Sequence, residues 1–440
     1  MKLGSDILKP RYAILLAFVV NIWTSSNMNW GGDNYRGIIA SDACGYYAYL
    51  PAIFIYKDLQ FSQFEKVEMS PQHYSVYMTQ DYRNKTKEGT VDKYYVGCAV
   101  LWAPFFFVAH TLAEPLGYAK DGYTKPYHIA INCAALFYLT LGFWALSKLL
   151  SSLGFSAKSI FWSLLWTEFA THLFYYAVCI CSFSHVYSFS VLCGFLLFTR
   201  KQILNPTLLN ALLIGLMLGL AVIIRPVNLL VIAFIPFLCE NFSGLKGIFL
   251  KTPFFHWFLA LLSFVAILFI QLGIYKIQTG HFFVYSYGEE GFYFLHPELF
   301  NFLFSFRKGF FIYTPVFFLA MIWGGYILWK RDQFKFWTLL IPLFIVFYVF
   351  SSWYCWWYGY GFSQRPMVDF LFVFSILACL IMDANSNYLR PFFFLGLFFL
   401  LLNQFQIYQA RYGLILPDHM TAEKYWDAFL NIQQLIEKTK

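Results

Sequence analysis

Long apolar runs alternate with short polar or aromatic segments along almost the whole chain. Most of these runs approach the 17–25 residues or so that a helix needs to cross the hydrocarbon core of a bilayer. Helices also satisfy their own backbone hydrogen bonds there. The pattern therefore predicts an all-α polytopic membrane protein with about eleven transmembrane helices. The expected spans are Arg11–Met28, Pro126–Leu149, Ser159–Val178, Phe183–Thr199, Thr207–Ile224, Pro226–Cys239, Pro253–Tyr275, Gly309–Trp329, Phe336–Phe350, Pro366–Met382 and Pro391–Tyr408.

Composition supports the same class. Hydrophobic residues make up 60% of the 440-residue chain, charged residues only 12%, and the mean hydropathy is +0.57. A soluble domain carries about 25% charged residues. The net charge of +8 comes from Lys and Arg scattered through short loops, which sets membrane orientation and gives no nucleic-acid-binding surface. The nine cysteines show no CxxC or Cys/His spacing, so neither a disulfide framework nor a zinc site is predicted.

The distribution of Lys and Arg predicts the orientation of the chain. Lys2, Lys9 and Arg11 precede the first span, and no small-residue cleavage site follows it, so we expect an uncleaved helix with a cytoplasmic N-terminus. The run Tyr95–Leu116 is weak as a spanning helix, because it contains Pro104 and has a polar end. If it only dips into the membrane or lies on its surface, the basic residues of the next two loops are cytoplasmic, as the positive-inside rule favours. These residues are Lys148, Lys158, Arg200 and Lys201.

The predicted domain organisation follows from this orientation. Residues 1–409 form one transmembrane domain, whose first outer loop, 29–125, contains amphipathic interfacial helices, and residues 410–440 form a short extracytoplasmic tail. The alternative lets Tyr95–Leu116 cross and merges the run broken at Arg225-Pro226 into one long helix. Both arrangements give the C-terminal half the same orientation, with Lys276–Lys308 and Ser351–Gln364 as outer loops.

The first outer loop opens with an acidic, aromatic stretch, Ser41–Leu59. Helical spacing places Tyr46 and Tyr49 on the same face as Asp42, and Pro51 should kink or restart the helix. An apolar stripe of Tyr46, Leu50, Ile53 and Phe54 would lie in the membrane interface. Asp42 is either a simple helix N-cap or a catalytic carboxylate held at the membrane surface.

Most polar residues without an evident structural role fall on the outer face. They are Asp42, Asp81, Asp92, Lys93, Glu289, Glu290, Arg307, Lys308 and Arg365. Arg307 and Lys308 are predicted on the outer side, whereas basic residues that set topology lie on the cytoplasmic side. Their position therefore favours a role in phosphate binding. Glu289 and Glu290 form either a solvated turn or a metal or acceptor site.

Three further features leave alternatives open. Arg225 lies at or near membrane depth, where an Arg costs about 2.5–3.5 kcal/mol, so it either faces a cavity, pairs with an anion or snorkels from a helix end. His185 is either a hydrogen-bonded helix-end residue or a ligand. The cluster of Trp353, Trp356 and Trp357 is either an interfacial belt or a surface that stacks on sugar rings.

Several phrases of the chain resemble the GT-C superfamily of membrane glycosyltransferases. The long first outer loop with its Asp-led aromatic helix and the run KYYVGCAVLWAPFFFVAH are similar to that superfamily's first loop and Lys-aromatic-Pro segment. The phrases THLFYYAV, FSHVYSF, FSFRKGFFIYTPVF and WWYGYGFSQRPMVDF resemble those of bacterial, especially Bacteroidetes-type, members. The resemblance extends over about Met1 to Tyr408.

The resemblance implies a bacterial inner-membrane enzyme with an extracytoplasmic active site and a polyprenyl-phosphate-linked sugar donor. Asp42 takes the place of the first-loop acid that acts as base or metal partner. One departure is that the Val178–Ser184 turn holds Cys179 and Cys181 but no second acid, which argues against a metal-dependent mechanism. We therefore predict no metal ligands, while a divalent metal remains an open cofactor.

We expect an inverting glycosyltransferase that moves a sugar to a glycan, lipid or protein acceptor, with Asp42 as general base. The expected substrate- or phosphate-binding residues are Lys93, Arg225, Arg307, Lys308, Arg365, Tyr46, Tyr49, Trp356, Trp357, Glu289 and Glu290. A flippase for lipid-linked sugar would also need outer Arg and aromatic residues, but it should show internal repeats and broken midplane helices. A non-catalytic assembly scaffold would need none of the outer charges.

Overall fold

The computed structural model describes residues 8–70, 73, 81–384 and 387–439, and parts of the hydrophilic run Glu65–Lys93 lie outside this range. The fold is predominantly α-helical, as the apolar runs predict, and its one sheet among the described residues is a two-stranded hairpin. The helices of the first half are α2 (Pro10–Asn29), α3 (Asp42–Pro51), α4 (Gly97–Ala113), α5 (Lys125–Ser152), α6 (Ala157–Phe169), α7 (His185–Leu204) and α8 (Leu208–Ile224). Those of the second half are α9 (Phe242–Lys251), α10 (Phe254–Thr279), α11 (Leu299–Phe304), α12 (Phe310–Tyr313), α13 (Pro315–Arg331), α14 (Gln333–Ser351), α15 (Phe372–Asp383), α16 (Leu389–Arg411), α17 (Ala422–Ala428) and α18 (Ile432–Thr439).

Five helices in the described part of the chain are long and apolar enough to cross a membrane: Gly97–Leu116, Lys125–Ser152, Phe254–Thr279, Gln333–Ser351 and Leu389–Arg411. A sixth candidate is the pair Pro226–Leu238 and Phe242–Ile248, which is bent by 118°. The membrane character predicted from composition thus agrees with the structure, whereas the count of eleven spans stays a prediction.

Several predicted spans are broken near one end. The run Ser159–Val178 is helical only to Phe169, where α6 ends, and a short π-helical turn, Tyr175–Cys179, follows after a break. The run Gly309–Trp329 is divided into α12 and α13 at Thr314, and Pro366–Met382 begins as a 3₁₀ segment, η9 (Arg365–Phe370). The expected break at Arg225-Pro226 is confirmed, because α8 ends at Ile224, Arg225 is extended and 3₁₀ turns follow over Pro226–Phe234. The last three segments named, α13, η9 and the 3₁₀ turns after Arg225, each have a proline at the first or second residue. Proline lacks the N–H that would continue the preceding helix, which accounts for the restart.

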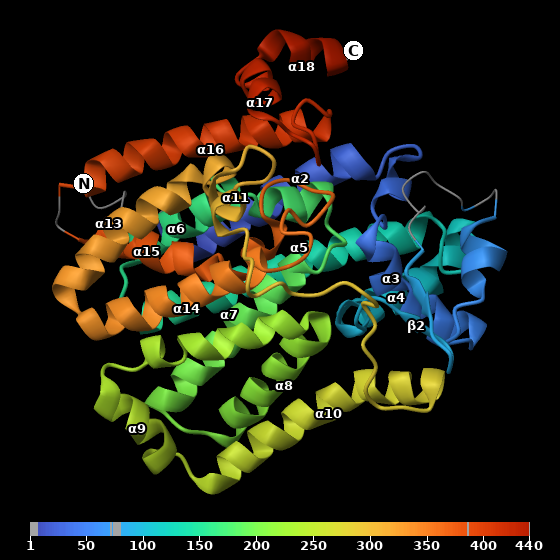
Figure 1. Ribbon diagram of the computed structural model, residues 1–440, viewed down its shortest axis with the longest axis horizontal. Helices are drawn as coiled ribbons and strands as arrows, with labels where there is room; N and C mark the ends of the chain where they lie inside the picture. Colours follow the sequence, from blue (N-terminus) through green and yellow to red (C-terminus); the bar gives the residue numbers. More distant parts are fainter. Residues whose placement is uncertain (1–7, 71–72, 74–80, 385–386, 440) are drawn as a thin grey trace.

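The bundle has two distinguishable ends (Figure 1). The N-terminal end of α2 and helix α9 lie toward one end, and α3, α4 and the hairpin strand β2 lie toward the other. Helices α8 and α10 run side by side along one flank, while α16 crosses the opposite flank and leads to α17 and α18. The strands β1 (Arg83–Lys85) and β2 (Thr90–Asp92) pair antiparallel, with Asn84 opposite Val91.

Helix α3 corrects one expectation from the sequence. Residues Ala43 to Pro51 are all buried, so Tyr46 and Leu50 contact protein instead of the membrane interface. Only the following π-helical turn, Ala52–Tyr56, exposes an apolar side chain, Phe54. The α-helix ends at Pro51, and the chain continues directly as the π-helical turn. The interfacial prediction is wrong for Tyr46 and Leu50, because α4 and the chain around β2 pack over α3.

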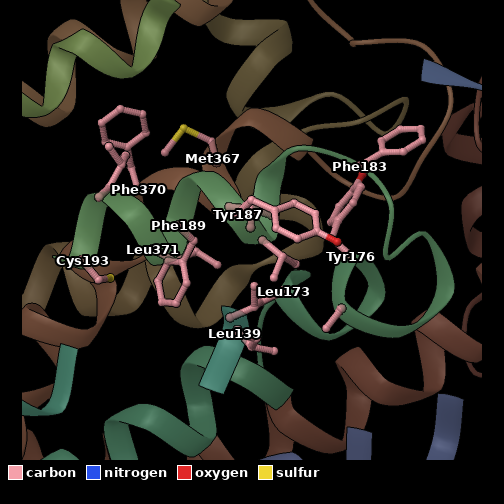
Figure 2. Packing of buried hydrophobic residues seen from close by; sticks show 14 of the residues in the cluster. Leu139, Leu173, Tyr176, Phe183, Tyr187, Phe189, Cys193, Met367, Phe370 and Leu371 are labelled. Atoms are coloured by element: carbon pink, nitrogen blue, oxygen red, sulfur yellow. The ribbon is translucent and has the colours of Figure 1, made fainter. Parts of the chain in front are cut away.

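A continuous buried core joins α7 to η9 and to the irregular chain between α6 and α7 (Figure 2). Tyr187, Phe189 and Cys193 of α7 lie beside Met367, Phe370 and Leu371, while Leu173, Tyr176 and Phe183 come from the chain before α7. All of these side chains are buried. This packing fixes the starts of α7 and η9 relative to each other, and both starts carry residues of the candidate site.

Candidate functional site

A cavity of about 420 Å³ lies where several irregular chain segments meet. Its wall combines the start of α3, the chain after β2, the start of α7, the break after α8 and parts of the loops 285–292 and 353–365. Six residues predicted for the site line it: Asp42, Tyr46, Lys93, Arg225, Glu290 and Arg365. Segments far apart in sequence therefore converge on one space.

Asp42 is ion-paired and hydrogen-bonded through both carboxylate oxygens. Arg365 Nη1 lies 2.7 Å from Oδ2, and the Tyr94 hydroxyl donates to Oδ1 at 2.8 Å. The preceding residue, Ser41, has φ +55°, a backbone conformation that is costly for a non-glycine residue, and its side chain makes no capping hydrogen bond. Both partners lie across the cavity wall, outside the helix that Asp42 begins. Asp42 is therefore more than the simple helix N-cap considered from the sequence.

The electrostatic environment of Asp42 contains opposing effects. Burial alone would raise the pKa of this carboxyl, but Arg365 and the hydrogen bond from Tyr94 outweigh it and hold the pKa below its usual value. Asp42 is therefore ionised at neutral pH while Arg365 is beside it. Loss of that neighbour would leave burial as the dominant effect.

Arg365 is held in place by the chain between α6 and α7. The Tyr176 hydroxyl donates to the Phe362 carbonyl at 2.9 Å and accepts from the Phe362 N–H at 3.1 Å. His172 Nε2 lies 3.0 Å from the Gln364 carbonyl. A Cβ on Gly361, at φ +132°, would lie 2.5 Å from the Tyr176 hydroxyl, so only glycine fits at this position.

A second carboxylate, Asp369, lies completely buried behind the cavity wall. Its Oδ2 is 2.8 Å from Arg225 Nη1, and its Oδ1 is 2.9 Å from His185 Nδ1. Arg225 and His185 both line the cavity. Arg225 is thus neither a snorkelling residue nor a free cation but half of a buried ion pair, which is one of the alternatives the sequence left open.

A third ion pair closes another part of the wall. Lys93 Nζ lies 2.5 Å from Glu290 Oε1, and the ammonium group is 5.6 Å from the centre of the Tyr94 ring. The adjacent loop is attached by Ser286, whose hydroxyl donates to the Lys93 carbonyl at 2.8 Å. Each of the three cations predicted to bind phosphate here, Lys93, Arg225 and Arg365, thus has a carboxylate partner that a substrate anion would have to displace.

Aromatic rings supply most of the remaining surface. They are Tyr46, Tyr94, Tyr95, Tyr285, Tyr287, Phe292, Trp353, Tyr354, Tyr358 and Tyr360. The Trp353 ring meets Phe292 edge-on, with centroids 4.7 Å apart, and the two residues also form an isolated backbone bridge. Rings with nearby polar groups suit sugars, whose C–H faces stack on aromatics while hydroxyls find partners at the edge.

Other predicted site residues lie outside this wall. Arg307 contacts Asp418 in the C-terminal tail through Nε and Nη2, at 2.8 and 2.7 Å, and stacks over Trp357 at 3.6 Å. Lys308 is buried and donates to the Gly361 carbonyl. Tyr49 donates to the Tyr94 carbonyl at 2.7 Å. Trp356 and Glu289 are likewise absent from the lining. The structure therefore gives Arg307, Lys308 and Tyr49 partners within the protein.

Sequence reasoning missed Asp369 and gave His185 no specific role. Asp369 falls inside the predicted span Pro366–Met382, where an ionisable residue is itself a signal for a functional site. That signal is present in the sequence itself. The pairing with His185, 184 residues away, required the fold.

In the described part of the chain, no three His, Cys, Asp or Glu side chains are arranged to hold a metal ion. Comparison with models of known protein families gives no match, and comparison with curated proteins gives none either.

Proposed function

We propose that the protein is an inverting membrane glycosyltransferase that uses a polyprenyl-phosphate-linked sugar and acts on an extracytoplasmic glycan, lipid or protein acceptor. The observation that carries the proposal is the Asp42–Arg365 ion pair, which joins an acid suited to proton abstraction and a phosphate-binding cation in one aromatic cavity. The sequence resemblance to GT-C enzymes supports the same reaction class.

In the proposed step, the acceptor hydroxyl oxygen attacks the anomeric carbon as its bond to the phosphate oxygen breaks. Asp42 takes the hydroxyl proton, and the bonding electron pair leaves with the lipid phosphate. The products are the glycosylated acceptor and polyprenyl phosphate. Attack opposite the leaving group inverts the anomeric configuration.

Arg365 links donor binding to activation of the base. A phosphate that draws Arg365 away from Asp42 removes the main influence that lowers the pKa of Asp42, so burial then raises it. The carboxylate becomes a stronger base when the donor is in place. The departing phosphate gains negative charge, which Arg365 stabilises in bidentate fashion.

The test is the substitution Asp42→Asn. Asn keeps the shape and still accepts a hydrogen bond from Tyr94 but cannot take a proton. Transfer from a polyprenyl-phosphoryl sugar should fall at least about a hundredfold, the usual contribution of a general base. Donor binding should persist.

A matched control is Asp58→Asn, which removes a carboxylate in the same loop that bonds to the backbone N–H groups of Gln60 and Ser62 and to the Ser62 side chain. This variant should transfer sugar like the wild type. An Asp42→Asn protein with wild-type transfer would refute the role of Asp42 as base.

A further inference from the structure

His185 lines the cavity and contacts the buried Asp369 through one ring nitrogen. It is the first residue of α7, its ring packs edge-on against Tyr176 with centroids 5.4 Å apart, and Nδ1 lies 2.9 Å from Asp369. Nε2 has no hydrogen-bond partner among the described residues. Since His185 lines the cavity, Nε2 is the ring nitrogen left to bond to a ligand there.

The partner of Nδ1 determines the tautomer. Nδ1 has two neighbours, Asp369 Oδ1 at 2.9 Å and Arg225 Nη1 at 3.3 Å. The contact with Asp369 is the shorter one, and an ionised carboxylate only accepts hydrogen bonds, so we infer that the imidazole carries its proton on Nδ1 and donates it to Asp369. Arg225 stabilises the ionised carboxylate through the other oxygen, at 2.8 Å. Nε2 of this neutral imidazole is consequently a hydrogen-bond acceptor.

An acceptor nitrogen discriminates between the two halves of a sugar phosphate. A phosphodiester oxygen has no proton to donate, whereas a sugar hydroxyl donates readily. Arg225 Nη1 lies 3.3 Å from His185 Nδ1, so a phosphate bound by Arg225 would place its sugar beside the imidazole.

We propose that His185, oriented by Asp369, forms a subsite that binds a hydroxyl group of the donor sugar through Nε2. This inference rests on the proposed glycosyltransferase function and adds to it the residue that recognises the sugar. Asp369 is a positioning residue. The arrangement selects for a hydroxyl at one position of the sugar ring.

The role of Asp369 has a specific chemical consequence. In Asp369→Asn the side chain offers one oxygen and one N–H₂ group to two donors, Arg225 and His185. If the oxygen accepts from Arg225, the amide donates to Nδ1, and the proton moves to Nε2. The substitution would then convert the cavity-facing acceptor into a donor without removing the imidazole.

Binding of two probes to the purified full-length protein in detergent tests the proposal. The probes are farnesyl methyl phosphate, a phosphodiester that lacks a sugar, and a panel of farnesyl-phosphoryl hexoses (mannose, galactose, glucose and N-acetylglucosamine), measured by calorimetry. At least one hexose conjugate should bind the wild type more tightly than farnesyl methyl phosphate, which has the same charge. His185→Asn should weaken binding of that conjugate about tenfold, the value of one well-formed hydrogen bond, and leave the affinity for farnesyl methyl phosphate unchanged.

Matched variants separate recognition from folding. Gln places its amide oxygen near the position of Nε2, so His185→Gln should retain part of the sugar-dependent affinity. In Asp369→Asn the Nε2–H group can donate to a phosphate oxygen as well as to a hydroxyl, so the difference in affinity between the two probes should shrink. His110→Asn alters a histidine outside the cavity wall, bonded to Tyr127 at 2.7 Å, and should change neither probe. Thermal unfolding checks that each variant is folded.

The outcomes distinguish the subsite from the proposed function. If His185→Asn binds the preferred conjugate like the wild type, or weakens both probes equally, the subsite is refuted. A wild type that binds no conjugate more tightly than farnesyl methyl phosphate also refutes the subsite and leaves phosphate binding intact. A wild type that binds neither probe refutes the proposed function and the subsite together.

Discussion

Arg365 faces a carboxylate that is already ionised, so its transfer from Asp42 to a donor phosphate exchanges one anionic partner for another. Its guanidinium also lies over the Phe183 ring, 5.0 Å from the centroid, which supports the side chain while its anionic partner changes. A single side chain can therefore act on the leaving group and on the base in the same step.

Substitution of Arg365 should change two observables. Arg365→Ala removes the cation that keeps the pKa of Asp42 low, so the acidic limb of the pH–rate profile should move to higher pH, and the apparent KM for donor should rise. Arg365→Lys should largely restore the position of the acidic limb, because Lys is also a cation. It should restore only part of the donor affinity, because a point charge cannot replace the bidentate hydrogen bonds of a guanidinium. An Ala variant with a wild-type pH profile and KM at limiting donor would refute the coupling.

Glu68 allows a separate test in the first loop. It accepts hydrogen bonds from Tyr82 at 2.8 Å and Tyr123 at 2.7 Å, and burial raises the pKa of its carboxyl to about 7. The folded state thus holds the proton more tightly than the unfolded state, whose pKa is near 4.5. Stability should fall as pH rises from about 4.5 to 7, by up to about 3 kcal/mol.

The comparison for this prediction is Glu68→Gln, which still accepts from the tyrosines but does not titrate. Thermal unfolding between pH 5 and 8 should show a shallower loss of stability in the variant. Equal pH slopes for variant and wild type would contradict the raised pKa of Glu68.

At the scale of elements, the site is built where regular helices stop. His185 begins α7, Arg225 follows α8, and Arg365 and Asp369 lie in the 3₁₀ start of the chain that becomes α15. The sequence predicted the helical class and the Arg225-Pro226 break, because hydropathy and proline act locally. It could not predict which outer polar residues meet, because Arg307 and Arg365 have similar aromatic surroundings in sequence. Only the tertiary fold pairs Arg307 with Asp418 and Arg365 with Asp42.

The close approach of α3 to the chain after β2 sets the position of Tyr94 against Asp42. A Cβ on Gly45 would overlap the Tyr94 ring and lie 2.9 Å from Asp92 Oδ1. In an open helix a Gly→Ala change gains about 0.5–1 kcal/mol. Here Gly45→Ala should instead destabilise the protein by about 1–3 kcal/mol through overpacking, and transfer should fall as Tyr94 leaves Asp42.

Gly273→Ala in α10 is the matched control, because a Cβ there meets no atom within 4 Å. Its melting temperature should be unchanged or slightly higher, and its transfer activity should equal that of the wild type. If Gly45→Ala behaves like this control, the tight contact between α3 and Tyr94 does not position the site.

At the scale of the whole molecule, the chain just before α4 and the loop after it are bonded to the same short segment of the first loop. Tyr49 donates to the carbonyl of Tyr94, just before α4. Tyr56 donates at 2.8 Å to the carbonyl of Asp121, in the loop that follows α4. Residues Asp42 to Tyr56 therefore run alongside α4, and about fifteen helical residues extend roughly 22 Å, less than the hydrocarbon thickness of about 30 Å.

This geometry favours the arrangement in which α4 does not cross the membrane, although its length and composition would permit crossing. The loop after α4 then lies on the outer side with Asp42.

Single cysteines at two exposed positions, Lys120 and Lys201, test this with a membrane-impermeant maleimide on intact cells. The cysteine at position 120 should be labelled from outside, and the one at 201 only after the membrane is permeabilised. The native cysteines of the described chain are buried or half-buried, so they should add little labelling of their own. Controls at Glu88 (outside) and Lys330 (inside) have the same orientation in both arrangements. The reverse pattern at 120 and 201, with both controls behaving as expected, would mean that α4 crosses. Asp121, in the loop after α4, would then lie across the membrane from Asp42, although Asp42 and Tyr56, the partner of Asp121, are joined by a segment of only about 22 Å.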